Sequence, residues 1–195
     1  YYHYQMDEPI LNFYSIVSAE YEVVKDKWSN GKQDVNLEIY YHKGHEYNLE
    51  RMMRSMKKSL DYFTKNFSPY QYRQLRIMEF PRYRSFAQSF SNTVPFSEEI
   101  GFMLDVGEDD VDIPFYVTAH EIAHQWWAHQ VTEASVQGNA MSSETMSQYS
   151  ALMVMKQELK PEIIQKFVKL ELDRYLRGRA NESKKEQPLD HVEGQ

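Results

Sequence analysis

The sequence has no cysteine among its 195 residues. This absence excludes a disulfide framework and any metal site built on thiolates, so a bound metal would need histidine, aspartate or glutamate ligands. No run approaches the roughly 18 uninterrupted apolar residues of a membrane span. The net charge of −7 leaves no excess of basic residues, which argues against a nucleic-acid partner.

Glycine and proline are also sparse, at seven each, whereas aromatic residues make up 14% of the chain. This balance is typical of a packed globular domain, and a hydrophobic content of 42% is enough for one sizeable core or two small ones. No signal peptide is recognisable, because the chain starts at Tyr1 within what reads as structured sequence. We therefore expect it to be a segment of a longer protein.

The predicted elements come as strands first and helices second. Apolar alternation predicts strands at 19–25, 35–41, 73–80 and 100–106. The first two are joined by an Asn-Gly pair, which favours a tight hairpin turn. Helices are predicted after the candidate cap Asn48 and at about 113–130, 141–158 and 161–178, with Asp112 as the cap of the second helix. This order predicts an α+β fold.

The stretch "VTAHEIAHQWWAHQVT" carries two histidines, His120 and His124, four residues apart. On an α-helix they lie about 40° apart and about 6 Å along the axis. Two imidazoles at that offset can bind one zinc ion with Zn–N distances of about 2.0–2.1 Å. Glu121 points about 100° away from His120. It can therefore flank the metal without binding it and accept a proton from the attacking water.

The alternative is that both histidines are ordinary packing or surface residues, which is the usual role of a single helical histidine. The pattern argues against it here. The apolar stripe of this helix lies roughly a quarter to a third of a turn away from the histidine pair. One face can thus be buried while the other lines a cleft, so the sequence favours a metal site.

A catalytic zinc site needs three protein ligands and one open position. Without cysteine, the third ligand should be a Glu, Asp or His on the next helix, and Glu144 in "MSSETMSQY" is the candidate. An acidic first turn that merely complements the helix dipole explains Glu144 equally well. Helix rules alone leave both interpretations open. His129 is not expected to bind the metal, because it lies on a different helical face from His124.

Three stretches together resemble the gluzincins, specifically zinc aminopeptidases of the aminopeptidase N type. "HEIAHQWWAHQVT" is similar to that family's H-E-x-x-H-x-W-x-G-N-x-V-T, and "SETMSQY" is similar to N-E-G-x-x-x-Y, with Glu144 in register. Upstream, "PFSEEIGF" resembles G-x-M-E-N-x-G, with Glu98 on its Glu and Gly101 on its second Gly. The likeness is greatest to a bacterial branch in which the peptidase domain is fused to an ABC-transporter-type permease.

The resemblance implies a thermolysin-like domain with a small N-terminal sheet followed by zinc-site helices. Residues 1–45 would end an N-terminal β region, 46–180 would form the peptidase domain, and 181–195 would be a polar tail or truncated linker. It also implies a peptide substrate, and a soluble domain whose parent protein is tethered to a bacterial membrane, on a side that the sequence does not assign.

The site residues implied by the resemblance are few. One zinc ion per chain would be held by His120, His124 and Glu144, with Glu121 as the general base. Glu98, together with Glu99, would bind the free amino group of the substrate.

The chain departs from the family pattern at several points. Nineteen residues separate His124 from Glu144, one more than usual, and Ala128-His129 and Ser143 replace Gly-Asn and Asn. The amino-end motif is reduced to Ser97-Glu98-Glu99. The family's transition-state tyrosine, in a Y-x-K-G-like context, is not recognisable before Gln195. We therefore expect the isolated segment to bind zinc but to turn over poorly. A thermolysin-type endopeptidase and a non-catalytic, peptidase-like module of a membrane transporter are the alternatives.

Overall fold

The computed structural model describes residues 3–181 and 185–191. Its four strands, β1 to β4, form one sheet in chain order: β1 (Glu22–Ser29), β2 (Asp34–Tyr41), β3 (Gln74–Phe80) and β4 (Thr93–Ser97). The helices are α1 (Leu49–Asn66), α2 (Ile113–Ala123), α3 (Glu144–Glu158) and α4 (Pro161–Asn181), with 3₁₀ turns η1 (Asn139–Met141) and η2 (Leu189–His191). The predicted α+β fold, a small sheet followed by helices, is confirmed.

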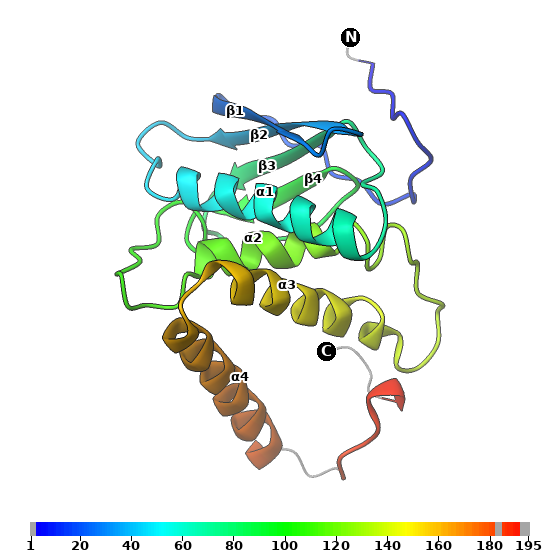
Figure 1. Cartoon of the computed structure of the whole chain (residues 1–195), viewed down its shortest axis with the longest axis vertical. Helices are drawn as coiled ribbons and strands as arrows, with labels where there is room; N and C mark the ends of the chain where they lie inside the picture. Colours follow the sequence, from blue (N-terminus) through cyan, green and yellow to red (C-terminus); the bar gives the residue numbers. More distant parts are fainter. Residues whose placement is uncertain (1–2, 182–184, 192–195) are drawn as a thin grey trace.

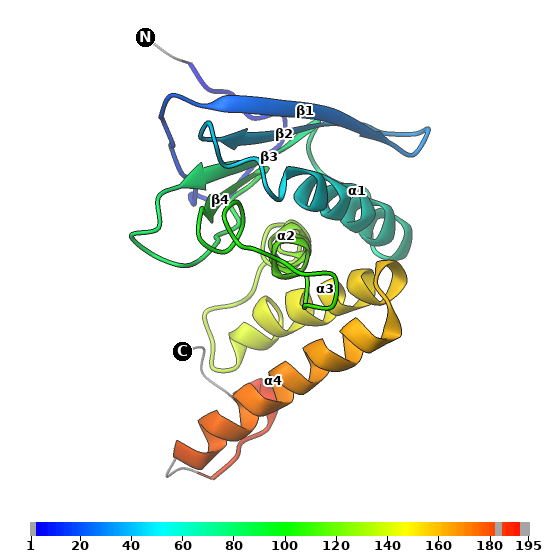
Figure 2. The ribbon, with the colours of Figure 1, turned by 90° about the vertical axis from the view of Figure 1, so that its left-hand side faces the viewer.

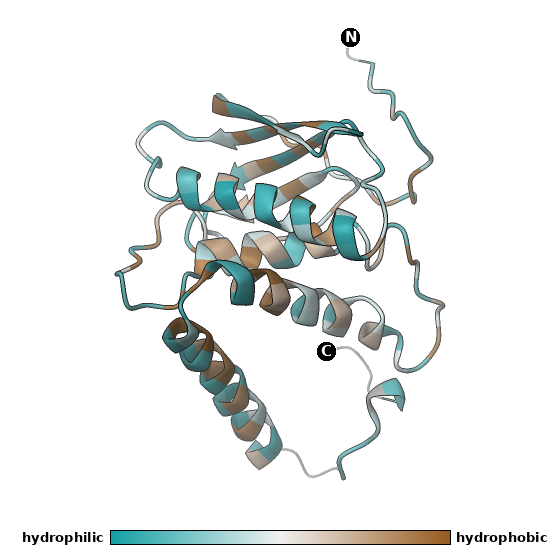
Figure 3. Cartoon of the chain, in the orientation of Figure 1, coloured by the Kyte–Doolittle hydropathy of each residue, from teal (hydrophilic) through white to brown (hydrophobic). Residues whose placement is uncertain are grey.

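The elements lie in layers (Figures 1 and 2). The sheet forms one side, α1 and α2 cover one of its faces, α3 packs beneath α2, and α4 is outermost. Figure 3 shows apolar residues over much of α2, as expected for a helix enclosed between a sheet and other helices. This central position fixes α2 from several sides.

The core lies between the sheet and the first two helices. Strands β2, β3 and β4 run parallel, with α1 as the crossover between β2 and β3, whereas β1 pairs antiparallel with β2. Alternate strand residues meet side chains of α1 that recur every three or four positions. The fully buried members include Leu37, Ile39, Leu75, Ile77, Val94, Phe96, Met52, Met56, Leu60 and Phe63. Each such side chain contributes about 1.5–3 kcal/mol by burial.

The hairpin between β1 and β2 forms as predicted, but β1 runs to Ser29, beyond the predicted end at residue 25. The reason is that β1 is an edge strand. Its charged residues from Lys25 to Lys27 face water, which hides the alternation, and Trp28 alone in this strand is buried. Gly31 in the connecting loop has a φ of 79°, which glycine adopts without strain.

The strand predicted at 100–106 is wrong. Residues 98–103 form turns, and the strand lies earlier, at β4. Burial of Phe102 explains why an irregular segment carries an apolar run. Pro95 sits within β4, where its carbonyl accepts the Gln88 N–H at 3.1 Å. Segment 86–90 lies along this outer side of β4 in antiparallel contact, and the proline needs no N–H there.

The helices differ from prediction at their ends. The α2 helix stops at Ala123 and not near residue 130, because tight turns follow it. The α3 helix starts at Glu144, three residues late, and α4 continues to Asn181. In the described part of the chain, no helix is long and apolar enough to cross a membrane. Of the predicted polar tail, residues 182–184 and 192–195 lie outside the described residues.

Candidate metal centre

The α2 helix that carries the histidines is fixed at its start by charge. Asp112 caps it as predicted, accepting the Phe115 N–H at 3.1 Å. Arg51 and Arg54 of α1 approach the same carboxylate at 2.9 and 3.7 Å. Asp112 is thereby buried with its counter-charges, and α2 is held in register along α1.

The structure brings the three candidate metal ligands together. The Nε2 atoms of His120 and His124 lie 3.1 Å apart, with the two rings nearly perpendicular. The Glu144 carboxylate faces both: Oε2 is 3.4 Å from His120 Nε2, and Oε1 is 3.5 Å from His124 Nε2. Two imidazole nitrogens and the two oxygens of one carboxylate thus converge from two helices on one place.

The separations between these atoms fit a zinc ion. Ligand atoms about 2.0–2.1 Å from a tetrahedral zinc ion lie about 3.3–3.4 Å from one another. The observed separations of 3.1, 3.4 and 3.5 Å bracket that value. Two imidazole nitrogens and one carboxylate are also a donor set that zinc prefers, and they leave a fourth position open.

Glu144 reaches the histidines because α2 and α3 cross in direct contact. Trp127 Nε1, just beyond α2, donates to Ser150 Oγ of α3 at 2.9 Å. Glu144 is the first residue of α3, and 65% of its side chain is exposed. Hydrogen bonds from His120 and His124 hold the pKa of Glu144 well below its ordinary value. Its carboxylate is therefore ionised, as a metal ligand must be.

His124 is oriented by its second ring nitrogen. Nδ1 lies 3.0 Å from the Trp127 carbonyl oxygen and 3.0 Å from Ser147 Oγ. A proton on Nδ1 donated to the carbonyl leaves the Nε2 lone pair free for a metal. Burial lowers the pKa of His124, but the hydrogen bond to Glu144 and the charge of Glu121 outweigh it and raise the pKa overall. His120 Nδ1, by contrast, is buried without a hydrogen-bond partner among the described residues.

Glu121 is almost completely buried, with 6% exposure. Burial raises the pKa of Glu121, and the neighbouring Glu144 raises it further, although His120 and His124 act in the opposite direction. A carboxylate with a raised pKa is a stronger base than an exposed one. This is the property required of a residue that takes a proton from water.

Sequence reasoning did not identify Ser147 or Tyr116 at this site. Ser147 is fully buried against His124, and Tyr116 lies one helical turn before His120, its hydroxyl bonded to Gln148 Oε1. Burial raises the pKa of Tyr116 to about 12, so the phenol remains neutral. The spacing of Tyr116, His120 and His124, four residues each, was the available signal.

The segment that follows α2 also holds the outer segment of the sheet. Gln125 is fully buried and donates to Ser89 Oγ and to the Phe90 carbonyl, at 2.7 and 2.8 Å. His129 Nε2 lies 3.2 Å from the Ser89 carbonyl oxygen, and burial lowers the pKa of His129. Segment 86–90 is thus fastened beside the candidate metal centre.

The two candidate substrate-binding residues have neighbours of their own. Glu98 belongs to a different cluster, where its carboxylate approaches His45 Nδ1 at 3.9 Å and accepts the Arg82 N–H at 3.2 Å. Glu99 is exposed. Within the described residues, neither contacts His120, His124 or Glu144 directly.

Solved structures share this fold. The chain is similar to aminopeptidase A of Legionella pneumophila in complex with aspartic acid, with a TM-score of 0.62 and 18% identity over 71% of this chain and 17% of that one. It is also similar to an M1 zinc metallopeptidase of Deinococcus radiodurans, with a TM-score of 0.59 and 18% identity over 87% of this chain and 35% of that one. A mutant of that enzyme bound to a Tyr-Ser-Ala substrate gives the same TM-score and identity.

These likenesses define the class of fold: the architecture is that of M1 zinc peptidase domains, in agreement with the motifs. The chain spans only 17% to 35% of the length of these proteins. No family model and no curated protein matches it.

Proposed function

We propose that the chain is the catalytic domain of a zinc-dependent peptidase of the aminopeptidase N type, which removes residues from the amino end of peptides. The observation that carries this proposal is the convergence of the His120, His124 and Glu144 side chains, with Glu121 buried beside them. The shared fold with M1 zinc peptidases supports it.

The residues have distinct roles in this proposal. His120, His124 and Glu144 hold the zinc ion, which supplies Lewis acidity towards the scissile carbonyl and lowers the pKa of water to about 7. Glu121 accepts the proton of the attacking water and delivers it to the leaving amine. The raised pKa of Glu121 suits both steps, because the buried carboxyl group holds a proton more firmly than an exposed one does.

Segment 86–90 is the surface against which a peptide would lie. Its bonds to β4 involve Phe86, Gln88 and Phe90. In antiparallel pairing the intervening residues turn their backbone groups the other way. The Ser89 carbonyl oxygen already has a neighbour, because His129 Nε2 lies 3.2 Å from it. The backbone of Ala87 is then available for an extended peptide that adds to the sheet edge.

Specificity for the amino end is the finer part of the proposal. It rests on the resemblance and on the solved aminopeptidase with the same fold. Comparing a peptide with a free amino end and its N-acetylated form separates the alternatives. Loss of hydrolysis on acetylation supports the aminopeptidase, and equal hydrolysis supports a thermolysin-type endopeptidase.

Metal content tests the site itself. After dialysis, Glu144→Ala should retain one zinc fewer per chain than wild type. Glu162→Ala is the matched control, since Glu162 is an exposed carboxylate in the first turn of α4 and should change nothing. Equal zinc in both variants would contradict the assignment of Glu144.

Hydrolysis of a tripeptide such as Tyr-Ser-Ala tests the chemistry. Glu121→Gln should keep its zinc and lose activity by about 100-fold or more, the usual contribution of a general base. If hydrolysis survives, Glu121 is not the base. The reduced amino-end motif, Ser97-Glu98-Glu99, favours a second candidate, a peptidase-like module that binds metal or peptide without cleaving. Peptide binding without hydrolysis in the full-length parent protein would establish that function instead.

A further inference from the structure

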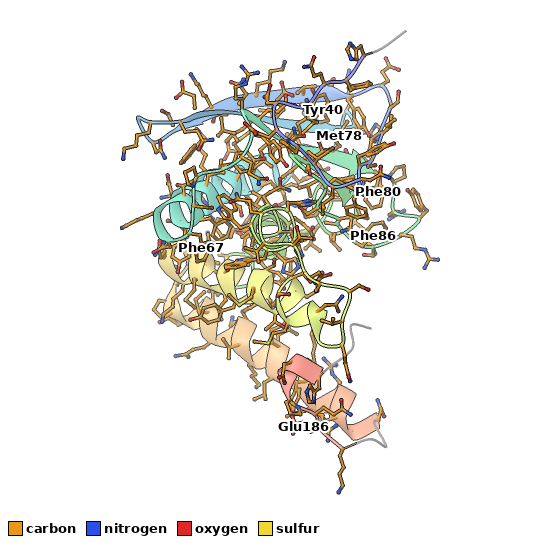
Figure 4. All side chains as sticks on the ribbon, turned by 90° about the vertical axis from the view of Figure 1, so that its right-hand side faces the viewer. Tyr40, Phe67, Met78, Phe80, Phe86 and Glu186 are labelled. Carbon is orange, nitrogen blue, oxygen red and sulfur yellow. The ribbon has the colours of Figure 1, made fainter. Side chains whose placement is uncertain are left out.

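A second group of potential metal ligands lies at the carboxyl ends of the parallel strands. His45 is in the loop between β2 and α1, Glu79 is the penultimate residue of β3, and Glu98 directly follows β4. Parallel strands bring their carboxyl ends to one edge of the sheet, where open α/β sheets bind ligands. Figure 4 labels Phe80, the residue after Glu79, at this end of β3, close to Phe86.

The three side chains converge on one point. Glu79 Oε1 contacts His45 Nδ1, Glu98 Oε2 is 3.9 Å from the same nitrogen, and all three atoms lie within 4.8 Å of one another. None of these residues belongs to the first metal centre.

Each carboxylate is oriented by its other oxygen. Glu79 Oε2 accepts the backbone N–H of His42 at 2.5 Å, and Glu98 Oε1 accepts the backbone N–H of Arg82 at 3.2 Å. These bonds turn Oε1 of Glu79 and Oε2 of Glu98 towards His45. Ligands of bound metals are commonly held by such outer hydrogen bonds.

The carboxylates of the cluster have little positive charge close to them. Glu79 is fully buried and the side chain of Glu98 is 16% exposed, so two carboxylates face one imidazole in a partly desolvated place. His45 Nδ1 can donate a hydrogen bond to Glu79. The distance of 3.9 Å from His45 Nδ1 to Glu98 Oε2 is too long for a hydrogen bond. Arg82 approaches Glu98 only at 3.8 Å and its side chain is 77% exposed. Buried carboxylates need closer compensation than this.

We propose that His45, Glu79 and Glu98 form a second cation site, which binds a zinc ion. One imidazole and two carboxylates suit zinc better than magnesium or calcium, which prefer oxygen ligands alone. The ion joins the loop after β2 to the segment after β4. Asn48 ties the same two segments by donating to the carbonyls of Gly101 and Leu104, each at 2.8 Å. The role of the site is therefore to fasten this edge of the sheet, apart from any catalysis.

The test counts zinc in the full 195-residue chain by elemental analysis after dialysis against zinc and then against buffer. Wild type should retain two zinc ions, and Glu98→Gln should retain one, with an affinity at the second site lower by about tenfold or more. Glu99→Gln is the matched control: it changes the adjacent, exposed carboxylate in the same way and should retain two.

A second measurement is made in a variant in which the first site is disrupted. In Glu144→Ala, added zinc should still raise the Tm, and adding Glu98→Gln to this variant should abolish the rise. If Glu98→Gln retains as much zinc as Glu99→Gln, or if Glu144→Ala shows no zinc-dependent rise, the second site does not exist and the cluster is a His–Glu ion pair. Failure of the first site would appear separately, as one zinc ion in wild type, none in Glu98→Gln and no loss in Glu144→Ala.

Discussion

Replacing Ala128 by glycine is predicted to stabilise the protein. Ala128 has a φ of 138°, which residues with a Cβ atom rarely adopt, and the family pattern has glycine at this position. A backbone held in such a region costs about 1–3 kcal/mol. Glycine loses more backbone entropy on folding than alanine does, and this loss offsets about 0.4–1 kcal/mol of the gain. The expected net gain in the free energy of unfolding is roughly 0.5–2 kcal/mol.

Thermal unfolding in the presence of a chelator measures this change without interference from zinc. For a chain of this size, each kcal/mol moves the Tm by about 2–4 °C. Ala134→Gly is the control, because Ala134 lies in the same connecting segment and lacks a positive φ. It should lose about 0.4–1 kcal/mol. A fall in the Tm of Ala128→Gly as large as that of Ala134→Gly would refute the argument from strain.

Three further predictions concern the metal site and its surroundings. Burial raises the pKa of Glu121 above its unfolded value, so its contribution to stability is present below the unfolded pKa and lost as the pH rises through the folded one. Glu121→Gln should therefore raise the Tm of chelator-treated protein at pH 7 and leave it nearly unchanged at pH 4; equal shifts at both would contradict this. Ser147→Ala should weaken zinc binding by about tenfold in a competition titration, because His124 Nδ1 loses one of two oriented neighbours. Gly101→Ala places a Cβ atom 2.7 Å from the Phe96 ring and should cost about 1–3 kcal/mol in urea unfolding, whereas Gly178→Ala, with free space, should gain about 0.5–1 kcal/mol.

The histidine pair could be predicted from sequence because its geometry is local. His120 and His124 lie on successive turns, and the His124 N–H still bonds the His120 carbonyl at 3.3 Å although the regular helix ends at Ala123. Glu144 is different. Its place depends on a nineteen-residue connection and on the crossing of α2 and α3, which helix rules do not determine. Only the family motif favoured it in advance.

The environment of Glu98 could not be predicted, because it depends on which segment forms the strand. With a strand placed at 100–106, Glu98 precedes the sheet; with β4 at Thr93–Ser97, it follows the strand and lies beside the end of β3. A shift of this kind moves every side chain relative to the sheet. His45 and Glu79 are far from Glu98 in sequence, so no motif of adjacent letters indicated their contact.

Several unfavourable features gather near the end of α2. Glu121 is buried as a charged group, His120 Nδ1 is buried without a partner among the described residues, and Ala128 has a strained φ. Each of these features lowers the stability of the fold, and a hydrophobic or glycine substitution would remove that cost. Such costs persist where function requires the residue, and a bound ion offsets them by about 2.7 kcal/mol at a free concentration 100 times its Kd. Their concentration around His120 and His124 is what selection for metal chemistry would leave behind and selection for stability alone would remove.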